Sequence, residues 1–256
     1  SKKGITDLEF ISKHANNNLA GLIIQSPNKF GLIENLTKIK KILIKSKGLF
    51  IISSNPVALS ILKSPGDCGA DIYVGEGQSL GNPMSFGGPL LGIMATKTQY
   101  KRMLPGRIVG KTVDKEGATG YVLTLQTREQ HIRKEKATSN ICTNQSLLAL
   151  RATIYMSLMG KQGFPYVANL CFNKSHYAAS KIDKLKHYNL KYNYNFINEF
   201  AIESNHNIDK LFTHCLKNNI LINVHKNENS FFKIAITEKR TKNEIEKLIT
   251  CLKSFK

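Results

Sequence analysis

The sequence predicts an α/β protein in which a mostly parallel sheet precedes a small α+β unit. The first observation is a set of short apolar segments, separated by helical patterns and turns, which is typical of parallel strands. These segments are residues 20–25, 49–52, 71–74 and 88–95. The second observation is a new pattern of strand, helix, strand, strand and helix that starts near residue 190. A chain of 256 residues is long enough to form one large or two smaller domains with apolar cores.

Two helical patterns are visible, one between the first two apolar segments and one before the α+β unit. Apolar residues at helical spacing predict a helix over residues 32–43, with Gly48 as its C-terminal stop. A second helix is expected to begin at a Thr143 N-cap and to end at Gly160, before another helical segment near Phe164. Its apolar stripe consists of Leu147, Leu150, Ile154 and Leu158. Residues 105–141, in contrast, are polar, charged and rich in glycine, and a loop of this length is often functional.

The net charge of +19 raises the question of a nucleic-acid partner. The charge is spread evenly: residues 97–136 carry ten Lys and Arg against four Asp and Glu, and residues 181–256 carry fourteen against eight. A solvated surface is therefore favoured over a dedicated nucleic-acid face. Weak nonspecific binding to nucleic acid stays an alternative, and a basic surface can also attract an acidic protein.

Cysteine usage and hydropathy indicate a cytoplasmic protein. The sequence has no apolar run long enough to cross a membrane, and its first residues lack the apolar core of a signal peptide. The five cysteines are widely separated, without the spacing of a zinc site or a disulfide framework, so we expect buried thiols and no metal. They are Cys68, Cys142, Cys171, Cys215 and Cys251.

Two segments are candidates for chemistry. The first is the G-x-G-x-x-x-G loop over residues 75–81, which follows an apolar segment but misses the dinucleotide fingerprint by one residue and lacks the Lys-Ser/Thr of a phosphate loop. Taken alone, the loop is better explained as a tight turn. The second is the basic cluster around Arg128, His131 and Arg133, which suits an anion or proton-transfer site but also a solvated, salt-bridged loop.

Long segments of the sequence resemble the P protein of the glycine cleavage system, and most closely its first subunit in organisms that divide the enzyme in two. They are GADIYVGEGQSLGNPMSFGGPLLGIMAT, KRMLPGRIVGKTVD, GYVLTLQTREQHIRKEKATSNICTNQSLLALRATIYMSLMGKQG and ITEKRTKNEIEKLI. The resemblance implies a fold of the aspartate-aminotransferase type, fold type I of the enzymes that use pyridoxal 5′-phosphate (PLP). It also implies a glycine dehydrogenase (decarboxylating), an oxidoreductase that passes the aminomethyl group of glycine to the lipoyl H protein.

The resemblance further implies three parts and an incomplete large domain. Residues 1–142 correspond to the C-terminal part of the large α/β domain, with the basic loop 97–136. Residues 143–189 form connecting helices, and residues 190–256 form a small α+β domain. Members of the family start well before this sequence, so a fragment, a split gene product or an inactive remnant are all open alternatives. A sheet that lacks strands exposes apolar surface, and we expect the isolated chain to be marginally stable or to aggregate.

At the site itself the sequence departs from a PLP enzyme. The resemblance places the Schiff-base lysine of the second subunit at Gln78, and places Asn55 near the Asp that holds the pyridine nitrogen protonated in related enzymes. Gln forms no imine, so we expect no cofactor on this chain alone. The isolated chain should be inactive, and PLP should be bound through the second subunit as partner. We expect the following residues to form an active-site wall or an interface: Asn55, Glu76, Gln78, Ser79, Arg128, His131 and Arg133.

Overall fold

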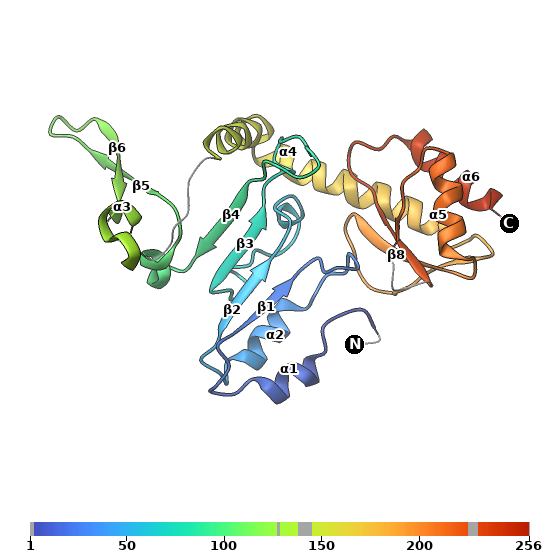
Figure 1. Cartoon of the computed structure of the whole chain (residues 1–256), viewed down its shortest axis with the longest axis horizontal. Coiled ribbons are helices and arrows are strands. Elements are labelled where there is room, and N and C mark those ends of the chain that lie inside the picture. Colours follow the sequence, from blue (N-terminus) through green and yellow to red (C-terminus); the bar gives the residue numbers. More distant parts are fainter. Residues whose placement is uncertain (1–2, 127–128, 138–144, 225–229, 256) are drawn as a thin grey trace.

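A computed structural model describes residues 3–126, 129–137, 145–224 and 230–255 (Figure 1). Its first sheet has four strands in the order β1-β2-β3-β4, of which the first three are parallel and β4 is antiparallel to β3. The mostly parallel sheet is therefore confirmed. Its strands are β1 (Gly21–Gln25), β2 (Leu49–Ser53), β3 (Ile72–Glu76) and β4 (Gly92–Thr96).

One face of this sheet is covered and the other is open. Helix α2 (Leu36–Leu43), which begins after the side-chain cap of Asn35, packs its buried Ile39 against Phe50 and Ile52 of β2. Helix α1 (Leu8–His14) lies beyond α2 and contacts it (Figure 1). On the opposite face Ile23 is 67% exposed and Met94 is 42% exposed. Apolar surface is thus left open where the pattern of β1 to β4 predicts burial on both faces.

The small unit is an antiparallel sheet in the order β7-β8-β10-β9. Phe200, Phe232 and Leu211 fill its core and are almost fully buried. The expected succession of strand, helix, strand, strand and helix is confirmed by β8 (Glu199–Ser204), α5 (Ile208–Lys217), β9 (Asn223–Val224), β10 (Phe231–Ala235) and α6 (Lys242–Ser254). One further strand, β7 (Tyr188–Leu190), joins the edge of the sheet.

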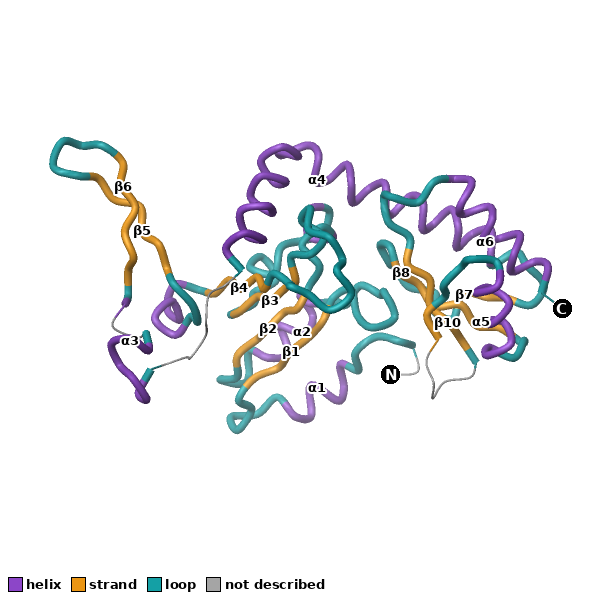
Figure 2. Tube along the Cα trace, turned by 45° about the horizontal axis from the view of Figure 1, so that its top comes forward, coloured by secondary structure: helices purple, strands orange, loops and turns teal. Residues whose placement is uncertain are grey.

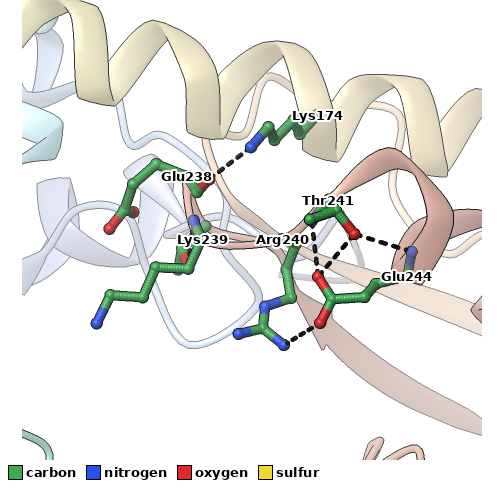
Figure 3. Close-up of polar contacts among 7 residues, drawn as sticks. Lys174, Glu238, Lys239, Arg240, Thr241 and Glu244 are labelled. Atoms are coloured by element: carbon green, nitrogen blue, oxygen red, sulfur yellow. Dashed lines mark hydrogen bonds and ion pairs between the residues drawn. The ribbon is translucent and has the colours of Figure 1, made fainter.

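The motif ITEKRTKNEIEKLI contains the turn before α6 and the first part of that helix (Figure 3). Thr241 caps this helix, because its hydroxyl accepts the N–H of Glu244 while the Glu244 carboxylate accepts the N–H of Thr241. Arg240 pairs with the same carboxylate at 3.1 Å. The ammonium of Lys174, from the long helix, donates to the carbonyl of Glu238. This last contact fastens the small unit to the helix that connects it to the first sheet.

That connecting helix, α4 (Ser146–Ile182), is kinked at Gly160, whose φ of 58° and ψ of −166° are not helical. The predicted end of the first helical segment at Gly160 is therefore confirmed, while Thr143 lies outside the described residues. The apolar stripe of this segment does not reach the interior: Leu147 is 74% exposed and Leu158 is 82% exposed. Helical spacing identified the stripe correctly, but no described element covers it.

The loop predicted over residues 105–141 differs most from expectation, because its described part contains a β-hairpin. Its strands are β5 (Ile108–Val113) and β6 (Thr119–Thr124), paired antiparallel. The hairpin projects away from the first sheet in both views (Figures 1 and 2). Short helices flank it: η2 (Thr98–Met103) precedes it, and α3 (Gln130–Arg133) and η4 (Lys134–Lys136) follow it. A further short helix, η1 (Ala58–Ser60), follows β2.

The helix expected over residues 32–43 begins later than predicted. Leu32 lies outside α2, is 1% exposed and makes an isolated bridge with Phe196 of the small unit. Its spacing from Leu36 imitates a helical repeat, but Asn35 stops the helix from extending backward. The segment before α2 therefore packs against the apolar core of the small unit, and it brings the first sheet and the small unit together.

Candidate functional site

A cavity of about 380 Å³ lies at the carboxyl ends of β1, β2 and β3. Gln25 ends β1, and Ser53, Ser54 and Asn55 follow along the end of β2. The third wall is the glycine-rich loop after β3. In open α/β sheets, ligands bind outside the carboxyl ends of parallel strands, so this cavity is the candidate site.

The glycine-rich loop is closed by its own hydrogen bonds. The side-chain amide of Gln78 donates to the carbonyl of Asn82 at 2.7 Å, and the Asn82 amide donates back to the carbonyl of Gly77 at 3.3 Å. One oxygen of Glu76 accepts the N–H groups of Gln78 at 2.9 Å and Leu91 at 3.1 Å. The side chains of Glu76, Gln78 and Asn82 therefore hold the loop closed, as a tight turn requires.

The wall from β2 contains a turn and an unsatisfied hydroxyl. Asn55 accepts the N–H of Val57 at 2.9 Å, which starts the turn into η1. Ser54 is only 7% exposed, and its hydroxyl has no partner among the described residues. The hydroxyl of Ser79, across the cavity, is likewise buried without one. Tyr73 donates to the carbonyl of Ser54 at 3.1 Å, and burial raises the pKa of its phenol.

The residues of this cavity do not fit a Schiff-base cofactor. The described lining contains neither lysine nor arginine, so it offers no amine for an imine and no fork for a phosphate. The position expected for the lysine holds Gln78, whose amide is bound to Asn82. Lys63, the nearest other lysine in the sequence, is exposed in a turn. Asn55 has no charge to pair with a pyridinium.

The structure gathers four of the seven predicted site residues and leaves the others apart. Asn55, Glu76, Gln78 and Ser79 all line the cavity. His131 and Arg133 lie on α3, beside the hairpin, and are not part of this lining (Figure 1). The ring nitrogen Nδ1 of His131 is 3.7 Å from the Glu129 carboxylate. Arg128 lies outside the described residues.

Sequence reasoning missed three polar residues of this cavity: Gln25, Ser53 and Ser54. All three stand at or directly after the ends of apolar strands. Because the carboxyl ends of parallel strands meet at one edge of a sheet, the boundary between apolar and polar residues could have identified them. The glycine-rich loop attracted attention instead because its composition is unusual.

Together, the parallel strands, the kinked connecting helix and the small antiparallel unit define the architecture of fold type I PLP enzymes. The solved structure of a NifS-like protein has the same fold, with a TM-score of 0.69 at 13% identity over 98% of this chain and 65% of that one. The fold class expected from the sequence is thereby confirmed. At 13% identity this likeness shows the fold alone.

The chain belongs to the family of the glycine cleavage system P-protein, whose model matches residues 3–252. A probable glycine dehydrogenase (decarboxylating) subunit 1 of Chloroherpeton thalassium is 48% identical over 99% of this chain and 58% of its own length. One of Desulforamulus reducens is 47% identical over 96% of this chain and 56% of its own length. A crystal structure of glycine decarboxylase (P-protein) in inhibitor-bound form superposes with a TM-score of 0.88 at 35% identity, over 93% of this chain and 55% of that one.

The chain therefore spans less than two thirds of the length of these relatives. The resemblance drawn from the motifs is confirmed at the level of the family and of subunit 1. Within the described residues, no helix combines the length and hydropathy needed to cross a membrane. The same residues bring no three His, Cys, Asp or Glu side chains together as metal ligands. Their four cysteines are buried, as expected, and Cys142 lies outside them.

Proposed function

We propose that this chain is part of the first subunit of a glycine dehydrogenase (decarboxylating) and supports a second subunit that carries PLP. In the complete enzyme, glycine loses CO2 and its aminomethyl group passes to the lipoyl H protein. This chain contributes an active-site wall or an interface and has no catalytic residue of its own. The domain division at residues 142 and 189, and a cytoplasmic location, belong to the same proposal.

The observation that carries this proposal is the state of Gln78. It stands in the loop after β3, and its side chain is used to close that loop onto Asn82. The family membership and the match to relatives named subunit 1 support a role in the same enzyme. The chain has the fold of this family, but the described lining of the cavity at the ends of its strands contains no lysine that could form a Schiff base. This favours a supporting subunit over a catalytic one.

Reconstitution tests this function directly. The second subunit of the same organism is assayed for exchange of labelled CO2 into glycine, with PLP and lipoyl H protein, in the presence and absence of this chain. We expect exchange to rise when the chain is added. Exchange that is unaffected by the chain contradicts the supporting role and leaves an inactive remnant as the better explanation.

The alternative of a nonspecific nucleic-acid-binding protein is separated by a salt titration. A protein that neutralises many phosphates loses DNA affinity steeply as salt rises. The spread of the +19 charge over the whole sequence leads us to expect only weak binding to a random duplex. Tight DNA binding with a steep salt slope, together with no effect on glycine exchange, favours the alternative.

A further inference from the structure

The β5–β6 hairpin presents one strongly apolar face. Residues opposite each other in an antiparallel pair share a face, and the register pairs Val109 with Leu123, Lys111 with Tyr121 and Val113 with Thr119. On this face Val109 is 60% exposed, Val113 is 62% exposed and Tyr121 is 71% exposed. Four exposed apolar side chains, counting Leu123 at 47%, therefore line the ribbon from end to end.

This exposed ribbon lacks support from the rest of the described chain. None of its residues belongs to either apolar core. Both views show it projecting beyond β4 (Figures 1 and 2). A two-stranded hairpin is at best marginally stable alone in water, and a third strand or a packing partner is needed to hold it. The apolar face is where such a partner contributes most, because burying it removes Val109, Val113 and Tyr121 from water.

The charge around this face selects the kind of partner. Lys111 lies in its middle and is exposed, with Arg107 before the hairpin and Lys115 in its turn. The turn also holds two carboxylates, Asp114, which accepts the N–H groups of Glu116 and Ala118, and the exposed Glu116, so three cations against two carboxylates leave the hairpin weakly positive. A second copy of a chain with charge +19 is repelled, whereas a protein with an acidic rim is attracted.

We propose that this face, defined as Val109, Lys111, Val113, Tyr121 and Leu123, is the docking surface for the PLP-carrying second subunit. The matching surface on that subunit is apolar at its centre and acidic at its rim. This inference rests on the proposed function and names the surface through which the two subunits meet. The apolar ribbon favours a protein over a nucleic acid, since polyanion binding needs cations rather than exposed Val and Leu.

Paired substitutions on the two faces of the hairpin test the proposal. Tyr121→Glu places a charge on the docking face, while Val122→Glu places the same charge one residue away, on the opposite face, where Val122 is 49% exposed. The Kd for the second subunit is measured by sedimentation or calorimetry. We expect Tyr121→Glu to weaken binding by about tenfold or more and Val122→Glu to change it little. Equal binding by the two variants overturns the docking face.

A second pair of variants, both charge reversals at exposed lysines, keeps the test independent of hairpin folding. Lys111→Glu reverses the charge at the centre of the face, and Lys115→Glu makes the same change in the turn. We expect the first to weaken binding more, and to reduce the salt dependence of the Kd more. Equal effects overturn the proposal. If the unmodified chain does not bind the second subunit at all, the docking face and the proposed function both fail; if it binds and the variants bind equally, only the docking face fails.

Discussion

The side-chain amide of Gln78 donates a hydrogen bond of 2.7 Å to the backbone carbonyl of Asn82. This bond spans the loop at the carboxyl end of β3, where the family resemblance expects a Schiff-base lysine. The Gln78 side chain thus has a structural role in this loop. The unusual glycine-rich composition of the loop follows from its tight geometry, since Gly81 has a φ of +82°.

Replacing Gln78 should therefore destabilise the loop. Gln78→Ala removes the donor to the Asn82 carbonyl, and we expect the free energy of unfolding to fall by about 1 kcal/mol. Urea unfolding provides the measurement. Gln25→Ala, at an exposed position on the opposite wall of the cavity, is the matched control and should change stability less. A Gln78→Ala chain as stable as the unmodified chain would show that the bond contributes nothing.

Acid should weaken the first sheet through Asp71. Burial raises the pKa of this carboxyl, but the hydrogen bond from Lys97 at 2.6 Å and the N–H of Phe50 outweigh it and hold the pKa below its ordinary value. A carboxyl with a lowered pKa in the folded state stabilises at neutral pH. That contribution is lost as pH falls below about 4 and through the lowered folded-state value.

The corresponding variant is Asp71→Ala, which leaves the buried N–H of Phe50 without its carboxylate acceptor. We expect it to cost about 1–3 kcal/mol at pH 7. Stability is measured by denaturant unfolding from about pH 7 to about pH 3, and the difference between the two chains should narrow toward the acid end. Asp67→Ala, which removes an exposed carboxylate, serves as control. A difference that does not depend on pH would rule out ionisation of Asp71 as its source.

The kink in α4 should tolerate no side chain at Gly160. Its φ of 58° with ψ of −166° belongs to a region that is essentially restricted to glycine. Gly160→Ala should cost about 1–3 kcal/mol. Gly163→Ala is the matched control, because this glycine is helical and an added Cβ approaches only Met159, at 3.0 Å from its Cε and 3.2 Å from its Cβ. Thermal unfolding of both variants is the measurement, and equal midpoints would argue against a strained kink.

The exposed stripe of α4 should make the isolated chain self-associate when its charge is screened. At low salt the net charge of +19 keeps molecules apart, while at high salt the apolar side chains dominate. We expect the sedimentation coefficient to rise with salt. The double change Leu150→Gln and Leu158→Gln should reduce this rise, and Ser157→Gln on the same helix should not. A monomer at all salt concentrations with one sharp, cooperative thermal transition contradicts the expectation that the isolated chain is marginally stable.

Strands with both faces apolar were predictable from the sequence. Phe50 and Ile52 lie in a continuous apolar segment and are fully buried, so composition alone located β2. The break inside α4 at Gly160 was equally visible. The spacing of apolar residues, however, does not predict which element covers each of them. Leu32 and Leu36 have the spacing of one helical stripe, yet Leu32 packs in the core of the small unit. Leu158, in a regular stripe, is left in water.

The hairpin was missed because its charged and glycine residues resemble those of a loop. The β-branched residues of Ile108–Val113, followed directly by the turn residues 114–117, were the available signal. At the site, only the family resemblance singled out Gln78, since a glutamine in a turn carries no chemical signal. The buried hydroxyl of Ser54 depends on packing in three dimensions and had no counterpart in composition.

The measurement that tests the central claim most directly is the position of the cofactor. The complex of this chain with the second subunit is saturated with PLP, reduced with borohydride to fix any Schiff base, and digested for peptide mapping. We expect one pyridoxyl-lysine per complex, on the second subunit, and no stoichiometric modification of this chain. A pyridoxyl-lysine on this chain at one equivalent, with an aldimine absorbance band when the chain is alone, would contradict the assignment of Gln78 and the supporting role derived from it.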